Sequence, residues 1–250
     1  MSILFILCPI IAIGAIIDAI AGGGGLITLT AYVAVGLPPQ IALGNNKFAA
    51  ASGTTIACYR FIRKDQVSWK VGTIAIVFSL VGSSVGSYLA THYADAYLHY
   101  LLIFLVPAIA VFIMLKPDFG QAKPMSSKYA IPLSAAAGLF LGAYDGFFGP
   151  GTGMFLTIIF TSVIGLDLLK SCGTAKVVNL ASNVAALFTF IRFGSIDYAI
   201  AIPCAISAII GGYIGSGLAI RGGVKVIRPV MLFVLVLLLL KVITSTFGLF

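Results

Sequence analysis

Ten apolar stretches, each bounded by glycine, proline or charged residues, constrain this chain more than any other feature of its sequence. They run over residues 2–21, 25–36, 42–61, 69–91, 97–115, 129–147, 152–165, 171–191, 196–220 and 227–248. Most reach the ~20 residues that cross a bilayer as a helix. Only 9% of the residues are charged, against about 25% in soluble domains, so too few polar side chains remain to cover a surface facing water. The sequence therefore predicts an all-α polytopic membrane protein.

The stretches form two copies of one unit. Residues that recur in order at an offset of 127 or 129 include Asp18 with Asp145, Gly22 with Gly149, Gly24 with Gly151, Lys47 with Lys176, and Phe61-Ile62-Arg63 with Phe190-Ile191-Arg192. A series of matches in the same order indicates an internal repeat. We therefore expect a first transmembrane repeat in residues 1–120 and a second in residues 121–250, within a single membrane domain. The N-terminal stretch lacks a basic n-region and has a counterpart inside the chain, so we expect it to be retained.

The stretches 25–36 and 152–165 are shorter than the others and directly follow glycine-rich runs. Each is either half of a re-entrant hairpin or a short complete span, and the sequence leaves both alternatives open. In either case the hairpin of each repeat contributes an even number of membrane crossings, and three further spans follow it. Each repeat therefore has an odd number of crossings, so the second repeat starts on the opposite side of the membrane from the first. This predicts two inverted repeats of about five segments each, an arrangement common among secondary transporters.

Loop charge supports this topology. The basic loops 60–70, 116–128 and 221–228 all fall on one side of a five-plus-five arrangement, and basic loops mark the cytoplasmic side. We therefore predict that these loops are cytoplasmic, that both termini are extracytoplasmic, and that the chain is a multi-pass protein of the plasma (inner) membrane. The same rule explains the net charge of +8, so no nucleic-acid partner is expected.

Two symmetric lysines are the leading candidates for substrate contact. Lys47 and Lys176 lie within apolar stretches, where a charge costs about 2.5–3.5 kcal/mol to insert. Short polar or glycine residues precede each one, so we expect both lysines at helix starts, where free N–H groups and the helix dipole favour anions. The predicted substrate-binding residues are Lys47, Lys176, Asn45, Asn46, Gly173, Thr174, Asn179 and Asn183. The alternative is that each lysine snorkels to a membrane interface.

Two symmetric aspartates precede the glycine runs. Asp18 and Asp145 could exchange protons, because burial disfavours a charged carboxylate, or they could cap the hairpin or pair with a lysine. The residues predicted to couple or gate are Asp18, Asp145, Gly22, Gly24, Gly149 and Gly151. The glycines allow positive φ and close helix approach. Neither run is a phosphate-binding loop, since no Gly-Lys-Ser/Thr follows. No cofactor and no metal site are expected.

Two segments of the second copy resemble the signatures of the sulfite exporter TauE/SafE family. They are AYDGFFGPGTG (Ala143–Gly153) and GTAKVVNLASN (Gly173–Asn183). The Gly22–Gly25 run and Asn45-Asn46-Lys47 fit the same pattern more loosely, and the resemblance covers essentially the whole chain. It is strongest to the subgroup that carries the YDGFFGPGTG form. The resemblance implies a secondary carrier for sulfur-containing anions such as sulfite, sulfoacetate or other organosulfonates.

The residues and the resemblance together predict a secondary transporter of a small anion, driven by protons or by the membrane potential. Its partners would be that anion and the lipid bilayer, and a homo-oligomer is left open. An uncoupled anion channel, or a carrier of a non-sulfur organic anion, would use the same charges. An enzyme is not expected, because the chain has no Glu and neither histidine has an evident nucleophile or metal partner.

Overall fold

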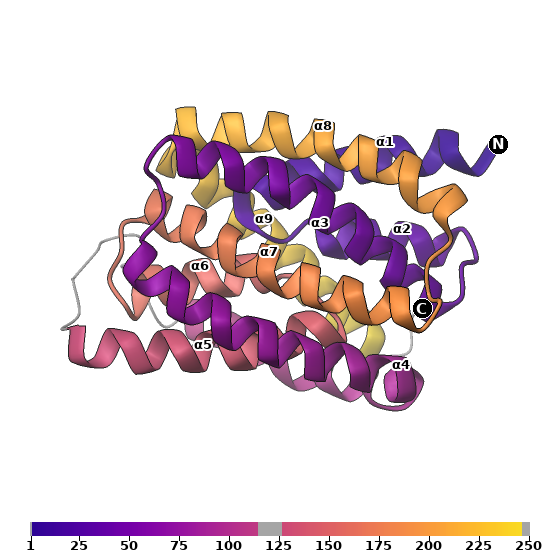
Figure 1. The fold of residues 1–250 in the computed structure, drawn as a ribbon, viewed down its shortest axis with the longest axis horizontal. Helices are drawn as coiled ribbons and strands as arrows, with labels where there is room; N and C mark the ends of the chain where they lie inside the picture. Colours follow the sequence, from indigo (N-terminus) through magenta and orange to yellow (C-terminus); the bar gives the residue numbers. More distant parts are fainter. Residues whose placement is uncertain (1, 115–126, 247–250) are drawn as a thin grey trace.

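The computed structural model describes residues 2–114 and 127–246. Within these ranges the chain forms helices and no strands (Figure 1). The helices are α1 (Ser2–Ala21), α2 (Gly25–Ala34), α3 (Pro39–Arg63), α4 (Trp69–Met114), α5 (Ser127–Phe147), α6 (Thr152–Ser162), α7 (Leu168–Arg192), α8 (Tyr198–Gly222) and α9 (Val224–Thr246). The predicted all-α class is confirmed for these residues.

The pairs α1–α2 and α5–α6 form two helical hairpins. Glycine allows the sharp reversals, because Gly22, Gly149 and Gly151 have φ of 82°, 103° and 87°, a region that other residues rarely adopt. The returning helices have only 10 and 11 residues. At 1.5 Å per residue each is roughly half as long as the ~30 Å hydrocarbon core. These lengths favour the re-entrant alternative for both short segments.

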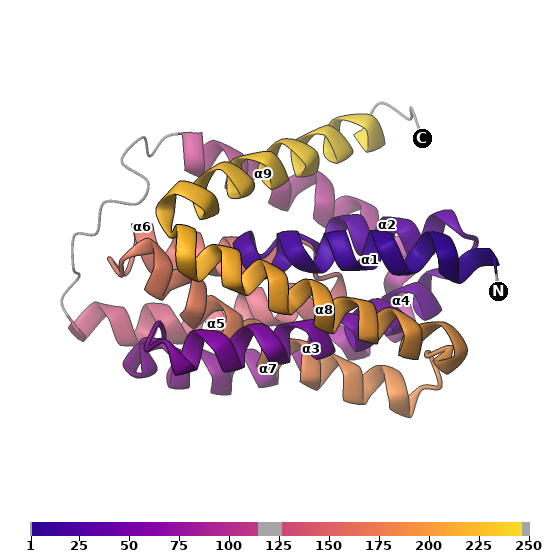
Figure 2. The same ribbon diagram turned by 90° about the horizontal axis from the view of Figure 1, so that it is seen from above.

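Element α4 differs from the sequence prediction. The stretches 69–91 and 97–115 were expected as separate segments, but the backbone is helical throughout Trp69–Met114. Figure 2 shows that the element does not run straight, since its later part returns to the end of the molecule at which Trp69 lies.

Corresponding helices of the two halves start at opposite ends of the molecule. In Figure 1, α3 begins on the right and ends on the left, whereas α7 begins on the left and ends on the right. The turn after α3 and the turn between α8 and α9 therefore lie at the same end, as expected for two of the three basic loops. The third loop, 116–128, lies largely outside the described residues. A twofold relation between the repeats stays a prediction.

The outer surface is suited to lipid. Five helices of the described chain are long and apolar enough to cross a membrane, and they cover Ile3–Ala21, Trp69–His92, Tyr129–Phe147, Leu168–Arg192 and Tyr198–Gly222. Large apolar side chains point outward along them, among them Phe140 and Phe188, which are 71% and 70% exposed. A soluble protein rarely exposes such continuous apolar surface. The chain is a multi-pass membrane protein.

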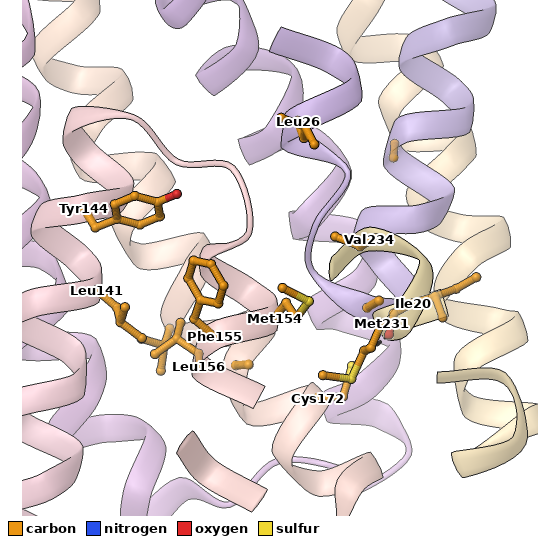
Figure 3. Packing of buried hydrophobic residues seen from close by; sticks show 14 of the residues in the cluster. Ile20, Leu26, Leu141, Tyr144, Met154, Phe155, Leu156, Cys172, Met231 and Val234 are labelled. Carbon is orange, nitrogen blue, oxygen red and sulfur yellow. Dashed lines mark hydrogen bonds between the residues drawn. The ribbon is translucent and has the colours of Figure 1, made fainter. Parts of the chain in front are cut away.

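The tips of the two hairpins contact each other in the interior. The backbone N–H of Met154 donates to the carbonyl of Gly22 at 3.1 Å, which links the second hairpin to the first. Figure 3 shows buried side chains of the core around this junction, among them Met154, Ile20 and Met231 of α9. A Cβ on Gly22 would lie 2.3 Å from the carbonyl carbon of Gly153. Only glycine therefore permits this approach.

Candidate functional site

The two symmetric lysines do not stand at helix starts, contrary to the sequence prediction. Helix α3 begins at Pro39 and α7 at Leu168, so Lys47 and Lys176 each lie more than two turns inside a helix. The short polar residues before them continue the helix, because neighbouring elements pack against these residues and bond to them. The helices that begin in the interior are instead α2 and α6, directly after the glycine runs.

Lys47 and Asp145 form a buried ion pair that joins the two repeats. Lys47 Nζ of α3 lies 3.0 Å from Asp145 Oδ2 of α5, and both side chains are 2% exposed. Lys47 Nζ also donates to Asn183 Oδ1 at 3.1 Å, and Ser182 Oγ donates to Asp145 Oδ2 at 2.6 Å. Hydrogen bonds of this kind offset part of the large desolvation cost of a buried pair. Gly149 closes over the pair, since a Cβ there would lie 2.8 Å from Lys47 Nζ.

Lys176 and Asp18 form the symmetric pair, in a different setting. Lys176 Nζ lies 3.1 Å from Asp18 Oδ2, and the Asp18 side chain is 24% exposed. Lys176 Nζ also donates to the backbone carbonyl of Asp18, which lies in the last turn of α1. Near it, Cys172 Sγ donates to the carbonyl of Ile20 at 3.2 Å. Lys176 thus adds a second donor to a carbonyl that already accepts the backbone N–H of Gly22 at 2.7 Å, and it ties α7 to the end of α1.

The different settings follow from the sequences of α3 and α7. At an offset of 129, the polar residues Asn179, Ser182 and Asn183 correspond to Ala50, Gly53 and Thr54. The second repeat therefore supplies amide and hydroxyl groups around Lys47–Asp145. The first repeat has alanine and glycine at two of these positions and keeps a hydroxyl only at Thr54. Gly53 packs against helix α8, where a Cβ would lie 2.7 Å from the carbonyl oxygen of Ala208.

A cavity of about 40 Å³ lies between the hairpins and helices α3 and α7. Its polar lining comes from Asp18, Thr28, Asn46, Lys47, Thr54, Asp145, Asn179 and Asn183, and Gly22, Gly24 and Gly149 also line it. One water needs roughly 10–15 Å³ on this scale, so the space suits a few waters or an anion of a few heavy atoms. The cavity brings together most of the residues predicted for binding and for gating.

Lys176, Gly151, Asn45, Gly173 and Thr174 are not among the lining residues. Asn45 Oδ1 accepts the backbone N–H of Asp197 at 2.9 Å, and Thr174 Oγ1 accepts that of Ser68 at 2.9 Å.

These two bonds are equivalent in the two repeats, and each fixes a loop of the other repeat, the one that precedes α8 or the one that precedes α4. The preceding glycines also correspond. A Cβ on Gly44 would lie 1.8 Å from the carbonyl oxygen of Ser195, and one on Gly173 would lie 1.9 Å from that of Gln66. These positions therefore have a structural task in the described contacts, and their predicted role in binding stays a prediction.

Thr28 was missed by the sequence analysis. It lines the cavity, and its hydroxyl donates to Asn46 Oδ1 at 2.5 Å. The corresponding residue of the second copy, at an offset of 127, is Phe155. The repeat pattern that revealed the lysines and aspartates therefore carried no signal for Thr28.

Comparisons with known proteins agree with this architecture. The family model described as "Sulfite exporter TauE/SafE" matches residues 7–242. The chain is 34% identical over 232 residues to "Probable membrane transporter protein YfcA" of Escherichia coli K12, covering 93% of this chain and 86% of the relative. It is 33% identical over 233 residues to "Probable membrane transporter protein ORF9" of Sinorhizobium sp, covering 93% and 89%. No solved structure matches the chain.

The helical fold, the apolar outer surface and the buried polar cavity define a multi-pass membrane transporter. The family match then places it more closely: the chain belongs to the sulfite exporter TauE/SafE family. The predicted family is confirmed.

Proposed function

We propose that this protein is a secondary transporter of a small anion, and that the anion binds in the central cavity beside Lys47. The substrate class is a sulfur oxyanion or an organosulfonate, such as sulfite or sulfoacetate. The proposal rests on one observation above the others: a fully buried lysine faces the cavity and is held by an aspartate and an asparagine from the other repeat. Membership of a family described as sulfite exporters supports the choice of sulfur anions.

The charge balance of the site supports coupling to protons. The two lysines and two aspartates sum to zero, so an added anion would leave an uncompensated buried charge, which is costly. If Asp145 takes up a proton when the anion arrives, Lys47 exchanges its carboxylate partner for the substrate and the site stays neutral. One proton would then accompany each monovalent anion. The amides of Asn179 and Asn183, which line the cavity, would provide N–H donors for the anion's oxygens.

The second ion pair would gate the site. Lys176–Asp18 ties α7 to the last turn of α1, next to the tip where Gly22 meets the other hairpin. Separation of the tips would require this pair to break or move. In inverted-repeat transporters one repeat rocks against the other around a central site. We propose this arrangement here, in the inner membrane, with the basic loops 60–70, 116–128 and 221–228 in the cytoplasm.

The test is uptake into proteoliposomes that contain a pH-sensitive dye. Sulfite, thiosulfate, sulfoacetate, sulfate and chloride are offered in turn, with and without an imposed potential. We expect saturable uptake of at least one sulfur anion, accompanied by proton movement. Uptake driven by potential alone would overturn proton coupling, and currents without saturation would indicate a channel. If only added non-sulfur carboxylates were taken up, the proposed substrate class would be wrong.

The Asp145→Asn variant tests the coupling step separately. It removes the proton acceptor but leaves Lys47 in the cavity. We expect anion uptake to continue while the accompanying proton signal falls to background. Asp18→Asn serves as the matched variant and is expected to keep the proton signal. Equal loss of that signal in both variants would contradict the assignment to Asp145.

A further inference from the structure

A second hollow, which shares no lining residue with the central cavity, lies where the C-terminal ends of α3 and α8 meet. Its volume is about 560 Å³, and its lining includes Tyr59, Arg60, Arg63, Lys64, Tyr213 and Arg221. Figure 1 shows the ends of α3 and α8 near each other at the end of the molecule where α4 begins. Pockets of roughly 300–1,000 Å³ are of the size that holds a small ligand or a head group.

The hollow carries four cations and no carboxylate lines it. In the described part of the chain, the ion pairs are those of Lys47 and Lys176, so the cations of the hollow have no carboxylate within salt-bridge distance there. Two of them are positioned by tyrosines instead. The Arg60 guanidinium lies 4.2 Å from the centroid of the Tyr213 ring, and Arg63 Nη1 donates to Tyr59 Oη at 3.0 Å.

Arg60 is the most firmly held of these cations. Its Nη1 donates to the backbone carbonyl of Tyr213, and a Cβ on Gly217 would lie 2.7 Å from the same nitrogen. A guanidinium has five N–H donors in a planar fork, so these contacts leave donors available. Fixed arginines of this kind bind phosphate groups through paired hydrogen bonds.

The surroundings of the hollow place it where lipid meets water. Along α8 the exposed apolar side chains are Ile202, Ile206, Ile209, Ile210, Ile214 and Leu218. Tyr59 and Tyr213 lie beside the last of these side chains at the edge of the hollow, 56% and 59% exposed, and Arg221 follows in the last turn of α8. This order matches a membrane interface, where tyrosines lie at the level of the head groups. Basic pockets between transmembrane helices bind anionic head groups.

We propose that this hollow binds the phosphate head group of an anionic phospholipid. The acyl chains would lie along the exposed isoleucines of α8, while Arg60, Arg63 and Arg221 hold the phosphate. The apolar surface beside the hollow favours a lipid over a free phosphate ion, which would gain nothing from it. The site is separate from the central cavity and does not depend on the proposed transport function.

The test measures how phospholipids bind to and stabilise the purified protein in detergent. Native mass spectrometry counts bound lipids, and thermal unfolding records the shift in Tm, with phosphatidylglycerol, with phosphatidylcholine and with inorganic phosphate. We expect phosphatidylglycerol to remain bound and to raise Tm, with little effect from the other two. In Arg63→Gln/Arg221→Gln we expect roughly 30-fold weaker binding, since each basic side chain near a membrane surface contributes about fivefold.

Two matched variants keep the test decisive. Lys70→Gln/Arg228→Gln removes the same charge from exposed positions that do not line the hollow, and should bind phosphatidylglycerol like the wild type. Arg63→Lys/Arg221→Lys keeps the charge and should retain most of the affinity. The proposal is overturned if both Gln variants lose lipid equally, if neither does, or if inorganic phosphate alone reproduces the Tm shift.

Discussion

The two buried ion pairs occupy equivalent positions in the repeats and have different surroundings. Lys47–Asp145 lies beside the cavity, with both side chains 2% exposed and with amide and hydroxyl partners from α7. Lys176–Asp18 includes an aspartate that is 24% exposed and a lysine that also bonds a backbone carbonyl. The two halves thus share these charges, while the polar residues around them differ. In the first pair, Lys47 is suited to exchange its carboxylate partner for a substrate anion. The second pair is suited to hold the end of α1.

The largest effect on stability is expected when Lys47 loses its charge. Lys47→Met leaves the Asp145 carboxylate buried without its cation, which typically costs about 3–5 kcal/mol. Lys176→Met should cost less, about 1.5–3 kcal/mol, because water reaches part of Asp18. The free energy of unfolding in mixed micelles checks both values.

Adding Asp145→Asn to Lys47→Met should restore much of the lost stability, because no uncompensated charge then remains. If the two single lysine variants were equally destabilised, the contrast between the pairs would be wrong.

The next largest effect is expected at the junction of the hairpins. Gly22→Ala adds a Cβ 2.3 Å from the backbone of Gly153, at a φ of 82°. The strained φ alone costs about 1–2 kcal/mol, and the clash adds to it, so we expect a total of at least ~3 kcal/mol.

Gly36→Ala is the matched control for this prediction. Gly36 has a similar φ of 86°, but nothing lies within 4 Å of the added Cβ. We therefore expect only the strain cost, about 1–2 kcal/mol. Thermal unfolding of the two variants side by side separates the cost of backbone strain from the cost of the steric clash. Equal losses of stability would mean that the close contact between the hairpin tips does not contribute to stability.

The smallest effect is expected at Ser182. Ser182→Ala removes a hydrogen bond to the buried Asp145 carboxylate, which should cost about 1.5–3 kcal/mol and stay below the cost of removing the lysine. Ser52→Ala, on α3, removes a hydroxyl that bonds the carbonyl of Phe48 in its own helix, and should change stability by less than about 0.5 kcal/mol. Denaturation curves that failed to distinguish the two would argue against a special environment at Asp145.

The sequence predicted much of this arrangement because the repeat is visible in it. The symmetric lysines, aspartates and glycine runs located the segments, and the residues predicted around them include most of the polar residues of the cavity. The positions of the helix starts were wrong, since glycine and asparagine before Lys47 suggested a helix cap. Whether such residues cap a helix or lie inside one depends on tertiary contacts such as that of Asn45 with Asp197.

The pairing of charges across the repeats could not be predicted either. The lysine of each repeat pairs with the aspartate of the other, and a sequence offset cannot distinguish this from pairing within one repeat. The re-entrant geometry was left open for a similar reason. The lengths of α2 and α6 become definite only when the helix ends are known.

The central claim is that the anion binds beside Lys47 and not beside Lys176. The most direct measurement is anion uptake by the two charge-neutral double variants, Lys47→Met/Asp145→Asn and Lys176→Met/Asp18→Asn, in the same proteoliposomes. For a sulfur anion that the wild type transports, we predict that uptake is at least ~100-fold slower in the first variant. In the second variant we predict that it is no more than about tenfold slower. Each tenfold change corresponds to ~1.4 kcal/mol. Equal uptake by the two folded variants, whether lost or retained, would contradict the account.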